Sequence, residues 1–292
     1  MGNRNTCAVV VTYNRLELLK ECIRALLTQT QAVSHVVVYN NASNDGTKEY
    51  LDTIASDRVI VFHSANNLGG AGGFSNGLKL AFEKTEDQFF WLMDDDTIVA
   101  NDCNEKLIDA QQTLGNDASF LISNVRWTNG DPANVMLTSD AWPSKIDAGL
   151  VQVKYGSFVS YSVSRKIVKK YGFPIEEMFI WGDDTEYSRR VSQVNPGYFV
   201  IAAHATHKSK SNNVASGLDK DSEDRIERYF YLYRNSTYTA KKYDGRKGEI
   251  KSFIDSFKML CKILFTAKSK KTKRAVVLIK GVFSGIWFDT HS

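Results

Sequence analysis

Three consecutive aspartates, Asp94, Asp95 and Asp96, follow the apolar stretch 89–93. Adjacent carboxylates repel one another, so this triplet needs a positive partner. Carboxylate oxygens are the ligands that Mg²⁺ and Mn²⁺ prefer, and these ions usually complete their coordination with water and substrate phosphates. One interpretation is therefore a divalent-metal site, with one carboxylate left for a sugar hydroxyl. The alternative is a solvated strand end at which Asp96 or Thr97 caps a following helix.

A second acidic cluster lies in GDDTEYSRR (182–190), where Asp183 and Asp184 precede a predicted helix. A carboxylate in this place can act as a general base toward an acceptor hydroxyl. Trp181, next to the cluster, offers the flat apolar face that sugar rings often contact, and it can equally belong to the core. The alternative for the two acids is an acidic first helical turn favoured by the helix dipole.

Two histidines, His204 and His207, lie three residues apart on the predicted strand 198–209. Because side chains alternate along a strand, this spacing puts the two rings on opposite faces, and one ion cannot easily take both. A lone histidine is more often structural than a ligand. Here the pair ends an apolar strand and precedes the polar stretch 209–225, a predicted loop, which favours one of them as a metal ligand.

The first hundred residues alternate between strand-like and helix-like segments. The predicted strands are 7–13, 35–40, 59–64 and 88–94, and the predicted helices are 15–29, 45–55 and 72–85. This alternation predicts an α/β fold with a mostly parallel central sheet flanked by helices. A polar cluster follows each strand (TYNR, NNASND, NNLGGAGG and DDD), and such sheets bind ligands beyond the carboxyl ends of their strands. The four clusters therefore predict a single site.

The glycine-rich stretch 66–77 is less specific than the other clusters. No lysine follows its glycines, and it matches neither the phosphate-binding loop nor the dinucleotide fingerprint. It is either a tight turn with close packing of a helix on a strand, or a place where backbone amides approach a ligand.

The composition is that of a globular protein. An apolar fraction of 43% and an aromatic fraction of 12% are ample for a packed core. The longest apolar runs are strand-sized, so no transmembrane helix is predicted, and the start lacks the apolar region of a secretory signal. The four cysteines are scattered, which suits a reducing cytosol better than a disulfide framework or a zinc site.

The chain resembles the family-2 glycosyltransferases, which have the GT-A fold. The matching segments span most of residues 7–210 in the family's order: VVTYNR (10–15), NNASNDGT (40–47), NNLGGAGGF (66–74), WLMDDDT (91–97), GSFVSYSVSRKIVKKYGFP (156–174), FIWGDDTEYSRR (179–190) and HKS (207–209). GGAGGF, WLMDDD, FIWGDD and YFYLYRN (229–235) together most resemble bacterial galactofuranosyltransferases. Rhamnosyltransferases that use a thymidine-diphosphate donor are nearly as similar.

The resemblance implies a role for each matching residue on the donor side. The residues that it assigns to the donor nucleotide are Thr12, Tyr13, Arg15, Asn40, Asp45, Asn67 and Asp95. Asn40 stands where the family commonly has Asp. The resemblance also implies Mn²⁺ or Mg²⁺ held by Asp94 and Asp96, with His207, in its HKS context, as a better match to the family's histidine ligand than His204.

On the acceptor side the resemblance implies Asp184 as the catalytic base and Asp183, beside Trp181, as a ligand of sugar hydroxyls. The implied reaction is one inverting displacement, in which the metal neutralises the leaving nucleoside diphosphate while Asp184 deprotonates the acceptor hydroxyl. No Ser/His/Asp or Cys/His arrangement is evident that would supply a protein nucleophile. A glycosidase with two carboxylates would need neither the aspartate triplet nor a nucleotide pocket.

The resemblance suggests transfer of galactofuranose from UDP-galactofuranose to a hydroxyl of a growing, lipid-linked cell-surface polysaccharide. The alternatives are rhamnosyl transfer from dTDP-rhamnose and a non-catalytic protein that binds a nucleotide sugar or glycan.

The C-terminal region is strongly basic. Residues 241–280 contain thirteen basic and three acidic residues, so this segment carries +10 and the remainder −6 of a net +4. The predicted helices 225–243 and 250–274 either pack on the catalytic domain with a solvated basic face, or lie on an anionic membrane surface. The acidic body and the lack of a recognition module argue against nucleic acid as a partner.

Two parts are therefore predicted: a GT-A catalytic domain at 1–224 and a helical basic region at 225–292. The predicted partners are a nucleotide-sugar donor, a glycan or glycolipid acceptor and, through residues 241–280, an anionic membrane surface. The predicted location is cytoplasmic, peripheral on the inner face of the cell membrane.

Overall fold

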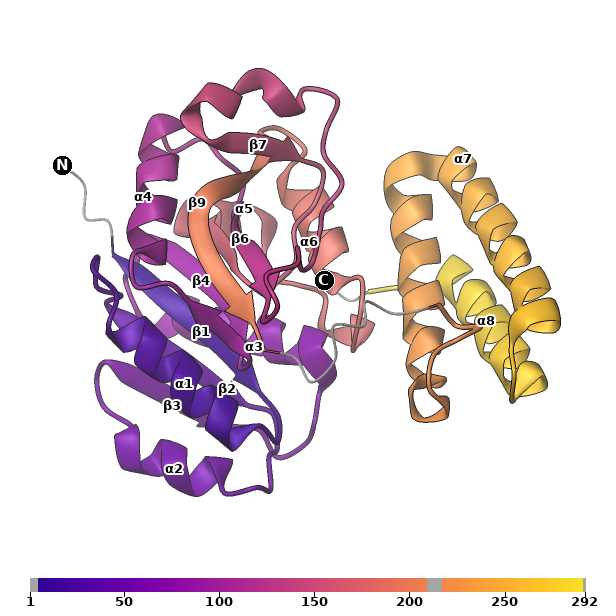
Figure 1. Cartoon of the computed structure of the whole chain (residues 1–292), viewed down its shortest axis with the longest axis horizontal. Coiled ribbons are helices and arrows are strands. Elements are labelled where there is room, and N and C mark those ends of the chain that lie inside the picture. The colour runs from indigo at the N-terminus through magenta and orange to yellow at the C-terminus, as the bar shows by residue number, and fades with distance from the viewer. Residues whose placement is uncertain (1–4, 209–216, 291–292) are drawn as a thin grey trace.

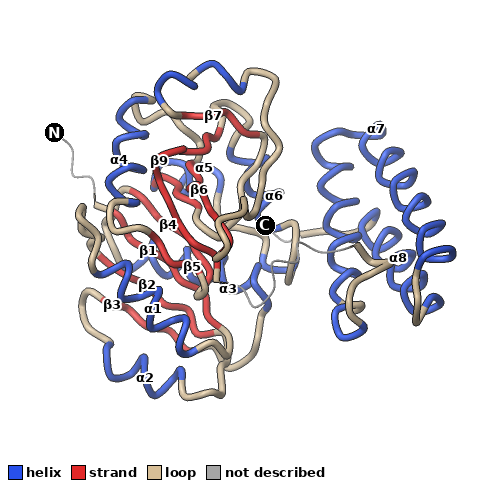
Figure 2. Tube along the Cα trace, in the orientation of Figure 1, coloured by secondary structure: helices blue, strands red, loops and turns tan. Residues whose placement is uncertain are grey.

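The computed structural model describes residues 5–208 and 217–290, so much of the predicted polar loop 209–225 lies outside the described residues. Nine strands form one mixed sheet between two layers of helices, as Figures 1 and 2 show. The strands are β1 (Thr6–Thr12), β2 (His35–Asn40), β3 (Val59–His63), β4 (Phe89–Asp94), β5 (Thr97–Val99), β6 (Leu121–Trp127), β7 (Leu150–Val153), β8 (Tyr161–Ser164) and β9 (Gly197–His207). The α-helices are α1 (Leu16–Leu27), α2 (Thr47–Ile54), α3 (Gly69–Lys84), α4 (Cys103–Thr113), α5 (Arg165–Tyr171), α6 (Asp183–Val191), α7 (Arg228–Thr266) and α8 (Lys271–Ile286).

The N-terminal half of the sheet is parallel. β1 lies between β2 and β4, and β2 pairs with β3, all in parallel register. Alternate residues of β1 enter opposite cores: Ala8 and Val10 face α1, α2 and α4, whereas Val9 and Val11 face α3, α5 and α6. A strand covered on both faces must be apolar at every position, which is why this stretch of the sequence lacks the alternation of a half-exposed strand.

The second half of the sheet is mixed and completes the order β3-β2-β1-β4-β8-β6-β9-β5, with β7 against β9. β8 joins β4 and β6 in antiparallel register, β6 and β9 are parallel, and β9 pairs antiparallel with β5 and β7. The predicted α/β fold, with a mostly parallel central sheet and helices on both faces, is confirmed.

Three local predictions need correction. No helix follows the aspartate triplet directly: Thr97–Val99 form strand β5, so the helix-cap interpretation of Asp96 and Thr97 is wrong. The predicted helix 225–243 and the first part of the predicted helix 250–274 merge into α7, which is kinked where Gly245 takes a positive φ of 59°. The helix predicted over 250–274 instead breaks after Thr266, and α8 starts at Lys271 behind a left-handed Lys270.

The glycine-rich stretch forms the first turns of α3, three residues earlier than predicted. Its glycines let this helix approach its neighbours closely. A Cβ on Gly73 would lie 2.5 Å from the side chain of Val11, and one on Gly77 would lie 3.0 Å from that of Val9. A Cβ on Gly69, whose φ is +72°, would lie 2.1 Å from the carbonyl oxygen of Phe179. Close packing therefore explains these three glycines.

The C-terminal helices α7 and α8 pack side by side at one end of the molecule (Figure 1). Gly281 and Gly285 of α8 lie against the α7 backbone, where a Cβ would come within 2.7 Å and 2.4 Å of carbonyl oxygens. The buried Arg274 of α8 donates hydrogen bonds to the carbonyls of Leu218 (2.6 Å) and Asp221 (2.9 Å). Within the described residues, no helix combines the length and the apolar character that crossing a bilayer requires.

We predict that Gly69→Ala lowers the free energy of unfolding by about 2–4 kcal/mol, because it adds both a strained φ and a clash with the Phe179 carbonyl. Gly70→Ala is the matched control, since nothing lies within 4 Å of its Cβ position and its φ is not positive. That substitution should be neutral or stabilise the helix by up to about 1 kcal/mol. Urea unfolding of both variants checks this, and equal stabilities would contradict it.

Candidate active site

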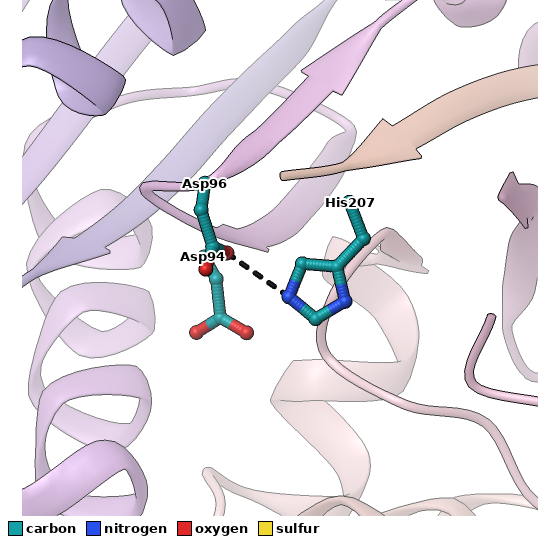
Figure 3. Close-up of side chains that lie close together, drawn as sticks. All are labelled: Asp94, Asp96 and His207. Atoms are coloured by element: carbon teal, nitrogen blue, oxygen red, sulfur yellow. Dashed lines mark ion pairs between the residues drawn. The ribbon is translucent and has the colours of Figure 1, made fainter. Parts of the chain in front are cut away.

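The sheet brings the aspartate triplet and His207 together. Asp94 ends β4, opposite Val11 near the end of β1, and Asp95 and Asp96 form the turn into β5. β5 then pairs antiparallel with β9 so that Thr97 is opposite His207. This register sets the imidazole beside the turn, although more than a hundred residues separate the two in the sequence (Figure 3).

Asp94, Asp96 and His207 each offer one ligand atom, and these atoms all lie within 4.8 Å of one another. The Nε2 of His207 is 3.1 Å from Oδ1 of Asp96. Its Nδ1 is 3.0 Å from Oδ1 of Asn134, and its ring stacks on Trp127 with centroids 4.8 Å apart. Because an amide oxygen only accepts, Nδ1 carries the proton in the neutral ring, and Nε2 has the free lone pair that a metal requires.

His204 lies on the other side of β9. Its side chain is exposed, and it is not part of the cluster. The predicted opposite orientation of the two histidines is therefore confirmed.

Asp95 is buried and faces the end of β1. Its carboxylate accepts hydrogen bonds from Thr12 Oγ1 (2.8 Å), the Tyr13 amide (3.2 Å) and Arg15 Nη1 (3.2 Å). Arg15 also contacts the carboxylate of Asp96. The guanidinium thus supplies part of the positive charge that the triplet needs.

The pKa values of the three aspartates show that the positive charge of Arg15 does not fully compensate their negative charge. Burial raises the pKa of Asp94 to about 7, and the charge of Asp96 adds to this effect. Burial likewise raises the pKa of Asp95 to about 6, against the charge of Arg15. Burial also acts on Asp96, but the nearby His207 and the charge of Arg15 bring its pKa below the ordinary value. One arginine and one histidine therefore leave the triplet short of compensating charge.

The residues present fit a divalent metal. Oδ1 of Asp96 is a buried oxygen without a hydrogen bond of good geometry, although Nε2 of His207 lies nearby. Two carboxylates and one imidazole form a donor set suited to Mn²⁺ and Mg²⁺ sites that keep positions for water and phosphate. An ion at this place would satisfy the unpaired oxygen and offset the repulsion within the triplet.

The second acidic cluster begins α6. Oδ1 of Asp184 accepts a hydrogen bond from the Thr185 amide at 2.6 Å. Burial raises the pKa of Asp184, while hydrogen bonds from Thr185 and Ser157 oppose the rise. Burial raises the pKa of Asp183 well above its ordinary value, and the charges of Asp184 and Asp94 contribute. The influence of Asp94 on Asp183 places the two clusters within electrostatic reach of each other.

The other predicted donor residues hold the loops at the same edge of the sheet. Nδ2 of Asn40 lies 3.0 Å from Nδ1 of His63, and Oδ1 of Asn40 accepts a hydrogen bond from the Ser43 amide. Asp45 accepts from the amide of Leu16, at the start of α1. Oδ1 of Asn67 accepts from Asn41 (3.0 Å) and from the Gly69 amide (2.8 Å). Thr12, Asn40 and Asp95 are buried, whereas the other members of the predicted set are exposed: Tyr13 (47%), Arg15, Asp45 and Asn67.

Trp181 is half-buried against the C-terminal helices. Its ring meets Tyr229 edge-on at 5.2 Å, and the guanidinium of Arg225 lies 5.6 Å from its centroid. The structure therefore gives this side chain a packing role, and its contact with a sugar stays a prediction.

Sequence reasoning did not find Asn134 or Trp127, which contact His207, or Ser157, which hydrogen-bonds the predicted base Asp184. Asn134 and Trp127 lie in a stretch without a recognisable motif, and Ser157 is one residue of a long matching segment that gives no sign of its role. Only their contacts in the folded chain reveal them.

A sequence model of glycosyl transferase family 2 matches residues 7–171, more than half of the chain. The chain belongs to this family. The matched range covers β1 to α5 and includes the aspartate triplet, whereas Asp183, Asp184 and His207 lie beyond it.

Part of the chain is similar to two curated galactofuranosyltransferases. It is 40% identical over 90 residues to GlfT1 of Mycolicibacterium smegmatis, which is 31% of this chain and 29% of that protein. It is 35% identical over 91 residues to GlfT1 of Mycobacterium tuberculosis, which is 30% of this chain and 29% of that protein. The match therefore spans less than a third of either relative.

Two solved structures share the fold at low sequence identity. GalNAc-T7 with UDP, GalNAc and Mn²⁺ superimposes with a TM-score of 0.60 and 15% identity, over 80% of this chain and 50% of that one. S. aureus TarS 1-349 in complex with UDP gives a TM-score of 0.54 and 15% identity, over 95% and 70%. The predicted GT-A architecture is confirmed at the level of the fold.

We predict that Mn²⁺ raises the melting temperature of the protein and that His207→Ala removes this effect. Loss of an outer-shell partner lowers metal affinity by about tenfold to hundredfold, and loss of the ligand His207 should lower the affinity for Mn²⁺ by more than that. His204→Ala is the matched control on the same strand and should keep the shift. Because Asp94 loses its proton only near pH 7, protons compete with the ion, and the shift should be larger at about pH 8 than at about pH 6. Equal shifts in the two histidine variants would refute the ligand set.

Proposed function

We propose that the protein is a metal-dependent, inverting glycosyltransferase that takes its sugar from a nucleotide-sugar donor. One observation carries this proposal: Asp94, Asp96 and His207 form a cluster that fits a divalent ion, and a second, separate pair of carboxylates begins α6. A purely binding protein has no need of this second pair. The non-catalytic alternative is therefore disfavoured.

The donor nucleotide binds, in this proposal, at the loops that follow β1, β2 and β3. Asp95 is oriented by Thr12 and the Tyr13 amide, so it is fixed to accept from ribose hydroxyls. Arg15, which contacts Asp95 and Asp96, is exposed at this edge of the sheet and would be available to the donor diphosphate. Asn40, Asp45 and Asn67 contribute chiefly by holding the shape of these loops.

The chemistry divides between the two clusters. Asp94, Asp96 and His207 hold Mn²⁺ or Mg²⁺, which when bound stabilises negative charge on the leaving diphosphate. Asp184 takes the proton of the acceptor hydroxyl as that oxygen attacks the anomeric carbon from the face opposite the leaving group. Its raised pKa makes it a stronger base than an exposed carboxylate. Asp183 and Trp181 orient the sugar.

The partial similarity to the two GlfT1 proteins supports UDP-galactofuranose as the donor. The sequence motifs shared with rhamnosyltransferases make dTDP-rhamnose the alternative. For the acceptor we propose a hydroxyl of a growing, lipid-linked cell-surface polysaccharide at the inner face of the cell membrane.

The surface of the C-terminal helices supports the membrane location. The apolar ridge of α7, α8 and the residue that follows α8 consists of the exposed side chains Ile250, Ile254, Phe257, Leu264, Phe265, Val276, Ile279, Phe283 and Trp287. The rings of Phe253 on α7 and Phe283 on α8 pack edge-on, with centroids 6.4 Å apart, and this contact connects the apolar residues of the two helices. Exposed lysines flank it, among them Lys247, Lys251 and Lys262. An apolar surface with a basic border is complementary to an anionic bilayer, to which each basic residue contributes about 1 kcal/mol.

Not every basic residue of 241–280 can serve in this way. Arg274 is buried and holds the segment 218–221, and Lys273 pairs with Glu227 at 2.7 Å. Fewer basic residues are therefore available to a membrane than the thirteen in the sequence of 241–280 suggest.

We predict that Asp184→Asn binds the donor with unchanged affinity and loses transfer by a factor of about a hundred or more, because the amide cannot accept the hydroxyl proton. The measurement is release of nucleoside diphosphate from a panel of nucleotide sugars, with and without Mn²⁺. UDP-galactofuranose should be the donor consumed. Full turnover by the variant would eliminate Asp184 as the base, and absence of metal-dependent turnover with every donor would end the proposed activity.

We predict that Phe257→Glu combined with Phe265→Glu lowers binding to vesicles that contain anionic phospholipid by at least about tenfold, because two aromatic side chains no longer enter the interface. Val194→Glu, an exposed apolar position on the catalytic body, is the control. Substitutions are preferable to deleting the chain after Tyr243, which would also remove the core residues Ile263 and Val277. Unchanged sedimentation with vesicles, or a change of oligomeric state in the double variant, would contradict the membrane role.

A further inference from the structure

The turn that leads into Asp183 and Asp184 has an uncommon backbone conformation. Phe179 and Trp181 both have a φ of 61°, and Gly182 has a φ of 95°. Residues with a side chain rarely adopt positive φ, and such conformations persist only when the surroundings impose them. Something outside this turn must therefore hold it.

The turn is held by Asn235 of α7, which is fully buried. Its Nδ2 lies 2.9 Å from the carbonyl oxygen of Met178, 3.2 Å from that of Ile180 and 2.7 Å from that of Trp181. Its Oδ1 accepts from Nε of the neighbouring Arg234 at 3.0 Å. The side-chain amide of this one residue thus contacts three backbone carbonyls between residues 178 and 181.

Two further contacts hold the same segment. Nη2 of Arg234 donates to the carbonyl of Glu177 at 2.6 Å. On the opposite side, the amide of Ala71 at the start of α3 donates to the carbonyl of Phe179 at 3.0 Å. The closeness of Gly69 to that carbonyl makes the contact possible. The glycine-rich motif, the FIWGDD motif and the end of YFYLYRN, which are far apart in the sequence, therefore meet at this turn.

We propose that Asn235 is a positioning residue for the base, acting through the turn 178–182 to fix the direction from which Asp183 and Asp184 enter the active site. The inference rests on the proposed function, in which Asp184 accepts the acceptor's proton. The carboxamide is the group required because all three of its partners at the turn are carbonyls, which need a donor. A carboxylate of the same shape would repel them. A displacement of about 1 Å in the base is enough to cost up to about a hundredfold in rate.

The test is Asn235→Asp, with Thr237→Val as the matched control. Thr237 is equally buried on the same helix, but its hydroxyl bonds Ser252 of α7 at 2.9 Å and does not face the turn. Asn235→Asp should lower kcat by at least about tenfold, with the KM for the donor and the Mn²⁺-dependent melting shift unchanged within about twofold. Thr237→Val should lose stability without this selective loss of kcat.

Hydrogen exchange gives a readout that does not depend on turnover. Amides of residues 178–186 should exchange faster in Asn235→Asp, while those of β4 and β9 remain as in the wild type. If Asn235→Asp does not fold, Asn235→Ser, which keeps one donor, takes its place with the same expectations in smaller size. Equal kcat and equal exchange in the Asn235 and Thr237 variants would overturn the inference. Should the wild type transfer no sugar, the proposed function fails, and faster exchange at 178–186 would still establish the hold on the turn.

Discussion

The accumulation of buried negative charge at the end of β4 is the constraint on which this structure depends. Asp94, Asp95 and Asp96 follow one another without a break, and burial makes the ionised form of Asp94 and Asp95 costly. Arg15, from the loop after β1, and His207 of β9 place positive charge beside these carboxylates. This compensation is incomplete, because one buried oxygen of Asp96 has no good hydrogen bond. The groups gathered at this edge of the sheet therefore still leave negative charge that a bound cation would compensate.

The C-terminal helices are integral to the proposed catalytic machinery. Asn235 and Arg234 of α7 hold the turn before the second acidic cluster, and Arg274 of α8 holds the segment 218–221 that follows β9 and the polar stretch. The turn before the second acidic cluster and the segment 218–221 are thus both tied to the helix pair that also carries the apolar ridge. The division into 1–224 and 225–292 stays a prediction, yet the contacts show that the second part stabilises the first.

Sequence reasoning went furthest where the pattern is local. The alternation of buried strands and amphipathic helices sufficed for the parallel half of the sheet, since both periodicities are set by residues near in sequence. At the glycine-rich stretch it left two interpretations open, and the close approach to Val9, Val11 and Phe179 favours the one based on packing. It failed at Thr97, where pairing with His207 outweighs the tendency of such residues to cap a helix.

By itself the sequence determined the fold class, the family and the identity of the charged residues around the site, because these depend on residue type and on short-range spacing. Only the tertiary structure decided that His207 and not His204 faces the aspartates, since strand register fixes which side a residue occupies. It also decided that Asn134 orients the histidine and that Asn235 holds the turn. Such assignments rest on single hydrogen bonds between residues far apart in the chain, and these exist only after the sheet and the C-terminal hairpin have come together.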